Sequence, residues 1–174
     1  MLLSLHERGK YWHLGLYLVL AVLTLLVYGQ TLGHDFINFD TPAYIQNNPM
    51  VNGGISRANM YAALTEFSVS NWHPLTWISH MLDVELFGLE PAGHHATNVM
   101  LHLLNVWLLF GLLWRVTGFI WPALLVAVLF AVHPAHVESV AWIAERKDLL
   151  SGLFFMLALH SYVCLLYTSP SPRD

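Results

Sequence analysis

Long apolar runs alternate with polar stretches along the chain. The four apolar runs cover residues 14–32, 96–114, 121–133 and 149–167. An α-helix needs about 20 mostly apolar residues to cross a bilayer, so the third run is short unless it continues into the polar stretch that follows it. The pattern predicts an all-α membrane protein with about four transmembrane helices.

The first run has two interpretations, a retained transmembrane helix or a cleaved signal peptide. It is long for the apolar part of a signal peptide, and no A-x-A-like cleavage site follows it. These two features favour a retained helix.

A long polar loop, residues 33–95, separates the first two apolar runs. Within it, Pro74 to Phe87 begins with a proline, which is favoured at the first position of a helix, and Leu75, Ile78 and Leu82 recur at helical spacing. We expect an amphipathic helix that lies in the outer membrane interface.

The stretch "FAVHPAHVESVAWIAERKD", residues 130–148, contains a second His-Pro pair and predicts a second segment of this kind. Its expected apolar face carries Val137, Val140, Ala141 and Ala144, and its expected polar face carries Glu138, Ser139, Glu145 and Arg146.

The composition agrees with a membrane protein and excludes some partners. Of 174 residues, 56% are hydrophobic and 10% are charged, whereas soluble domains have about 25% charged residues. The net charge is −4 and no tract rich in lysine or arginine occurs, so nucleic acid is not an expected partner. The single cysteine, Cys164, cannot form an internal disulfide.

Basic residues near the apolar runs predict the orientation, because lysine and arginine concentrate on the cytoplasmic side. Arg8 and Lys10 precede the first run, and Arg115 lies between the second and third. The N-terminus and this turn are therefore expected in the cytoplasm, and the loop 33–95 outside. Arg146 and Lys147 would then lie outside, against the rule.

Residues 168–174, with the sequence TSPSPRD, break from the apolar pattern and are expected to be disordered. Two origins stay open: non-native sequence joined to a truncated reading frame, or a short cytoplasmic tail.

The polar residues of the stretch 130–148 have three interpretations. Zinc would use His133, His136 and Glu138, but the histidines are three apart, whereas the zinc motif H-E-x-x-H places them four apart. Simple helix capping would use Glu138 near one helix end and Arg146 and Lys147 near the other. A phosphate site would use the helix N-termini at the His-Pro pairs together with the two basic residues.

Asp40, in "FINFDTPAYIQNNP", is a candidate general base for this outer layer. It lies between apolar residues that could hold it at a fixed depth. The alternative is an Asx-type turn in which Asp40 caps the local backbone.

Three motifs occur in order: "INFDTPAYIQNNP", "HPLTWISHMLDVELFGLEPAGHH" and "LFAVHPAHVESVAWIAERKDLLS". Together they resemble bacterial membrane proteins of the GT-C glycosyltransferase superfamily that carry C-terminal tetratricopeptide repeats. They are similar to the transmembrane and tetratricopeptide repeat containing O-mannosyltransferases. The resemblance covers residues 14–167.

The resemblance implies a glycosyltransferase that moves a sugar, mannose or a similar hexose, from a polyprenyl-phosphate donor to a hydroxyl acceptor, with a protein among the candidate acceptors. It implies the inner membrane of a bacterium and an extracytoplasmic active site. No cofactor is firmly predicted, and the use of a divalent metal stays open because Thr41 replaces the second acidic residue of the family's pair.

Matched to the family's motifs, Asp40 is the implied general base. The implied ligands of the donor phosphate are His73, His133, His136, Arg146 and Lys147, and Glu138 and Asp148 are implied to support them.

Since no tetratricopeptide pattern occurs, we expect this chain to be the N-terminal part of a longer protein. Two other functions remain as alternatives: a non-enzymatic membrane anchor or assembly scaffold, and a zinc-dependent membrane hydrolase.

Overall fold

The computed structural model describes residues 3–168, so the expected disordered tail lies outside the described residues except for Thr168. The described part consists of helices and connecting turns, without a β-strand. The α-helices are α1 (Leu3–Tyr28), α2 (Pro49–Asn52), α3 (Arg57–Thr65), α4 (Pro74–Phe87), α5 (Pro91–Thr117), α6 (Ile120–Val132), α7 (Val137–Ala141) and α8 (Arg146–Thr168). The shorter turns are η1 (Gly29–Gly33), η2 (Pro42–Gln46), η3 (Pro134–His136) and η4 (Ile143–Glu145).

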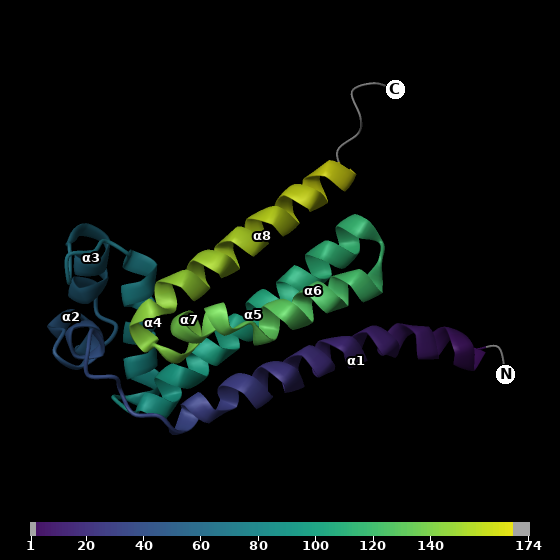
Figure 1. Cartoon of the computed structure of the whole chain (residues 1–174). Helices are drawn as coiled ribbons and strands as arrows, with labels where there is room; N and C mark the ends of the chain where they lie inside the picture. Colours follow the sequence, from purple (N-terminus) through teal and green to yellow (C-terminus); the bar gives the residue numbers. More distant parts are fainter. Residues whose placement is uncertain (1–2, 169–174) are drawn as a thin grey trace.

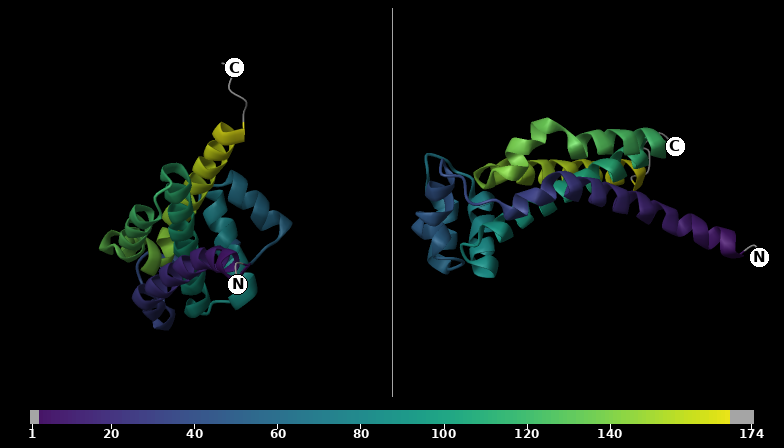
Figure 2. Two further views of the ribbon diagram at one scale, coloured as in Figure 1. Left: turned by 90° about the vertical axis from the view of Figure 1, so that its right-hand side faces the viewer. Right: turned by 60° about the horizontal axis from the view of Figure 1, so that its bottom comes forward.

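The long helices α1, α5, α6 and α8 run side by side, while η2, α2, α3 and α4 gather at one end (Figures 1 and 2). We call this group, residues 42–87, the head. Three helical segments are long and apolar enough to cross a membrane: Trp12–Gly33, Pro91–Thr117 and Ile143–Thr168. The pair Ile120–Val132 and Pro134–Ala141, bent by 48°, makes a fourth if it is counted as one broken span. The predicted all-α membrane fold is confirmed.

Small residues let α6 pack closely against its neighbours. Ala123, Ala127 and Ala131 recur every four residues on one face of α6, and all three are buried. They form one core cluster with Leu20 of α1 and Phe110 of α5. Small side chains allow helix backbones to approach closely in membranes, where the hydrophobic effect gives little drive for association.

Polar side chains of α5 bond to backbone carbonyl groups of the neighbouring helices. Two of these carbonyl groups, those of Ala131 and Val140, lie just before the breaks at His133 and Trp142. Pro134 has no backbone N–H, and the N–H of Ala135 bonds to the His133 ring, so the end of α6 keeps unpaired carbonyls. Such groups are costly in a membrane unless a partner is supplied. The pairs are His102 Nε2 with the Ala131 carbonyl oxygen (3.1 Å), Asn98 Nδ2 with that of Val140 (3.3 Å) and Asn105 Nδ2 with that of Leu149 (2.9 Å).

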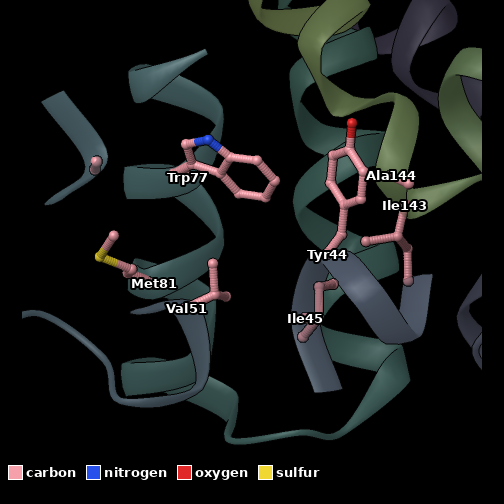
Figure 3. Close-up of a cluster of buried hydrophobic side chains, with 8 residues drawn as sticks. Tyr44, Ile45, Val51, Trp77, Met81, Ile143 and Ala144 are labelled. Atoms are coloured by element: carbon pink, nitrogen blue, oxygen red, sulfur yellow. The ribbon is translucent and has the colours of Figure 1, made fainter. Parts of the chain in front are cut away.

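The head is held to the membrane helices by an apolar cluster, shown in Figure 3. Two of its residues, Ile143 and Ala144, come from η4, directly before α8. The sequence pattern favoured a regular helix through this stretch, but the backbone is extended at Trp142 (φ −94°, ψ 111°). The interruption lets Ile143 and Ala144 enter the head. The cluster consists of Tyr44, Ile45, Val51, Ala63, Trp77, Met81, Ile143 and Ala144.

Candidate functional site

Arg146, the first residue of α8, makes a buried ion pair with Asp83 of α4. Both side chains are almost completely removed from solvent, and Arg146 Nη2 lies 2.6 Å from Asp83 Oδ2. The pair joins the head to a membrane helix at the point where α8 begins. Removal of one partner from a buried pair typically costs about 3 to 5 kcal/mol, because the other charge stays buried without compensation.

The remaining hydrogen-bond donors of Arg146 are also occupied. Nε donates to Asn98 Oδ1 (2.7 Å), Nη2 donates to the His94 carbonyl oxygen (3.0 Å), and Nη1 donates to the Ser79 carbonyl oxygen (3.3 Å). Arg146 therefore differs from the expected phosphate ligand on a polar outer face. It lies inside the protein and binds α4 and α5.

Lys147, the next residue, points outward. Its side chain is 37% exposed, and Nζ donates to Glu145 Oε1 at 2.8 Å. Both basic residues at the start of α8 thus have acidic partners within the chain. In the orientation predicted from the sequence, the charge rule disfavours basic residues at this position, and their acidic partners would offset that charge.

Lys147 and His73 line the same pocket. Its volume is about 240 Å³, and it lies between the N-terminus of α4 and the first two turns of α8. His73 precedes the proline that begins α4, as the His-Pro pair predicted. The other lining residues are mostly apolar: Pro74, Leu75, Thr76, Leu150, Ser151 and Phe154.

Tyr44 of η2 connects this pocket electrostatically with Asp40. The Tyr44 ring lies 5.7 Å from the His73 ring, and its hydroxyl accepts a hydrogen bond from Asn71 Nδ2 at 3.2 Å. Burial raises the Tyr44 pKa; Glu145 and Asp40 raise it further, and Lys147 lowers it. All three charges therefore act on one hydroxyl group.

His73 is kept neutral by its surroundings. Burial is the main cause that lowers the His73 pKa, and the charge of Lys147 lowers this pKa further. A neutral imidazole beside an ammonium group offers both a hydrogen-bond donor and a positive charge to an anion in the pocket.

Asp40 is half-buried in the turn before η2. Its carbonyl oxygen accepts from the Tyr44 N–H at 2.9 Å, so the backbone, rather than the carboxylate, makes the local turn contact. Within the described residues no hydrogen bond engages the carboxylate. The Asx-type cap considered from the sequence is absent among these residues.

His133 and His136 lie apart from the pocket. His133 Nδ1 accepts from the Ala135 N–H at 3.2 Å, which caps η3, and the His136 ring lies 5.3 Å from that of His102. Tyr28 donates to the His133 carbonyl oxygen at 3.3 Å. The five expected phosphate ligands are therefore split into His73 with Lys147, buried Arg146, and this separate histidine group.

The two expected supporting carboxylates also differ in their surroundings. Asp148 Oδ2 accepts from Ser139 Oγ at 3.1 Å, which ties α8 to α7. Glu138 is exposed on α7. Neither side chain makes an ion pair with Arg146, Lys147 or a histidine among the described residues.

Asp83, His80 and His94 were not singled out from the sequence, although they form the buried polar centre of the molecule. Their signal was present: His80 and Asp83 are three apart on α4, opposite Leu75 and Leu82, which are 53% and 46% exposed. The polar face of an interfacial helix usually faces water, whereas here it packs against the protein.

The sequence of this chain is similar to those of several curated proteins. The chain is 34% identical over 149 residues to protein O-mannosyl-transferase Tmtc1 of Drosophila melanogaster, covering 82% of this chain and 17% of that protein. It is 36% identical over 156 residues to TMTC1 of Mus musculus, covering 83% of this chain and 16% of that protein. A Caenorhabditis elegans protein O-mannosyl-transferase is 32% identical over 167 residues, 90% of this chain and 24% of that protein.

The chain is a homologue of the TMTC-type protein O-mannosyl-transferases. The resemblance read from the three sequence motifs is thereby confirmed. The chain spans between 16% and 24% of the length of these three relatives. No family model and no solved structure matches it.

The difference in solvent exposure between Arg146 and the exposed arginines can be tested by chemical labelling. Phenylglyoxal reacts with accessible guanidinium groups, so we expect it to modify Arg57 and Arg115, which are exposed, and to spare buried Arg146. Peptide mass spectrometry of the labelled protein in detergent measures the three sites separately. Labelling of Arg146 as fast as of Arg57 would show that the ion pair does not shield it.

Proposed function

We propose that this chain forms the donor-binding part of a membrane glycosyltransferase that transfers mannose from a polyprenyl-phosphate carrier to a hydroxyl group. The observation that carries the proposal is the pocket, which joins Lys147 and His73 to an apolar wall on a membrane-crossing helix. The names of the relatives supply the sugar. A protein acceptor and the GT-C mechanism belong to the same proposal.

The composition of the pocket suits a lipid phosphate. Leu75, Leu150 and Phe154 offer apolar surface to the isoprenoid chain, while Lys147 and His73 offer charge and hydrogen bonds to the phosphate. The N-terminus of α4, a helix of 14 residues, adds the positive end of its dipole. Arg146 acts indirectly, because its ion pair fixes the start of α8 and so the position of Lys147.

The proposed reaction needs a base beside the phosphate. The acceptor hydroxyl oxygen attacks the anomeric carbon of the sugar, the bond from that carbon to the phosphate oxygen breaks, and the phosphate leaves with the bonding electrons. Asp40 takes the proton from the hydroxyl. The Asp40 carbonyl oxygen accepts from the Tyr44 N–H, and the Tyr44 ring lies 5.7 Å from the ring of His73 in the pocket, which supports this assignment.

We also propose that the head lies on the extracytoplasmic side of a bacterial inner membrane, with the N-terminus in the cytoplasm. Arg115, in the last turn of α5, lies at the far end of that helix from the head, where the charge rule favours the cytoplasm. The basic residues on the head side are Arg57, Arg146 and Lys147, of which the last two have acidic partners.

Donor binding is tested on this chain in lipid nanodiscs with a photoreactive polyprenyl phosphate. Lys147→Gln removes one charged hydrogen bond and is expected to weaken labelling by about tenfold. Arg115→Gln removes an exposed positive charge at the other end of α5 and should leave labelling unchanged. Equal labelling of wild type and Lys147→Gln would contradict the donor site and favour a non-enzymatic anchor.

The general base is tested in the complete gene product. Asp40→Asn is expected to lower mannosyl transfer to an acceptor peptide by about 100- to 10,000-fold, the usual contribution of a general base, with donor labelling retained. Asp35→Asn changes an exposed carboxylate five residues earlier and serves as the control. If the two variants transfer mannose at the same rate, Asp40 is not the base.

A further inference from the structure

A group of polar atoms without hydrogen-bond partners lies buried between α4 and α5, next to the ion pair of Asp83 and Arg146. It comprises both ring nitrogens of His80 and Nδ1 of His94. Asp83 Oδ2, which pairs with Arg146, lies 3.4 Å from His94 Nδ1. All three side chains are almost completely buried, with exposed fractions of 0%, 0% and 2%. Buried polar atoms normally have partners, so a cluster of unpaired ones calls for a physical explanation.

The tautomer of His94 makes the cluster unusual. His94 Nε2 lies 3.1 Å from the Gly88 carbonyl oxygen. A carbonyl can only accept, so the neutral ring carries its proton on Nε2, and the lone pair of Nδ1 points toward the Asp83 carboxylate. Nδ1 and Asp83 Oδ2 are 3.4 Å apart. Two acceptors that face each other need a cation or a proton between them.

His80 supplies a third donor atom to the same place. One donor atom each from His80, Asp83 and His94 can be chosen so that all lie within 4.8 Å of one another. Neither ring nitrogen of His80 has a hydrogen-bond partner among the described residues, so a ring lone pair is available to a metal ion.

We propose that His80, Asp83 and His94 bind a zinc ion. Two imidazoles and one carboxylate are a ligand set that zinc uses in proteins, and ligand atoms around a tetrahedral zinc ion are about 3.3 Å apart. The distance between His94 and Asp83 already has this value. The inference is independent of the proposed function, because the site is separate from the pocket.

Neighbouring groups orient these side chains, as the outer hydrogen-bond partners of ligands do in metal sites. The Gly88 carbonyl oxygen orients His94, and Thr97 Oγ1 donates to Asp83 Oδ1 at 2.8 Å, so Oδ2 is the oxygen that faces His94 and Arg146. His80 and Asp83 lie three apart on α4, and His94 lies in the first turn of α5. Zinc would therefore fasten the head to the second membrane helix.

Arg146 sets a limit on this site, because its guanidinium also contacts Asp83 Oδ2. The ion and Arg146 share one negative charge, so they compete for it electrostatically. Arg146 retains three neutral partners, on Asn98, Ser79 and His94, if the ion draws the carboxylate toward itself. Arg146→Gln should for this reason bind zinc more tightly than wild type.

The test loads the purified chain in detergent with zinc, removes the excess, and counts zinc per chain by mass spectrometry. We expect about one zinc per chain in wild type and in His34→Ala, which changes an exposed histidine. We expect a loss of at least tenfold in His80→Ala and His94→Ala. Less than one zinc in ten wild-type chains overturns the proposal, as does full retention in both variants.

A second measurement keeps the proposal testable if these variants do not fold. Cobalt added to wild-type protein should give the intense visible absorption of a four-coordinate ion with nitrogen and oxygen ligands, and zinc should abolish it. The weak absorption of six-coordinate cobalt, or absorption that zinc does not displace, would overturn the assignment.

Discussion

The ion pair between Asp83 and Arg146 is the constraint on which the arrangement of this molecule depends. Two charges at the edge of a membrane domain are costly to bury, and they are tolerated here because every donor of Arg146 has a partner. Those partners come from α4 and α5, while Arg146 itself begins α8. One side chain thereby fixes three helices relative to one another.

The consequence for the proposed site follows from the spacing of neighbouring residues on a helix. Consecutive side chains point about 100° apart, so a buried Arg146 directs Lys147 outward, into the pocket beside His73. The apolar cluster of the head also fixes the start of α8, because Ile143 and Ala144 anchor the chain three and two residues before Arg146. In the proposed function the inner basic residue, Arg146, thus serves folding and the outer one, Lys147, serves recognition.

The sequence predicted the elements well because their signals are local. Proline at the first position and leucines at helical spacing defined α4 from Pro74 to Phe87, and apolar length defined the membrane helices. The partner of Arg146 could not be predicted, because Asp83 is 63 residues away and nothing local distinguishes a buried polar face from a hydrated one. The same holds for the separation of His133 and His136 from His73, since similar His-Pro motifs begin helices at different places.

A double-mutant cycle on Asp83 and Arg146 tests this account most directly. The free energy of unfolding is measured in detergent, with a chelator present, for wild type, Asp83→Asn, Arg146→Gln and the double variant. Each single change leaves a buried charge without its partner and should cost about 3 to 5 kcal/mol. The double variant should lose less than the sum of the two single losses, by about 1 to 3 kcal/mol. Strictly additive losses would contradict the claim that this pair holds the three helices together.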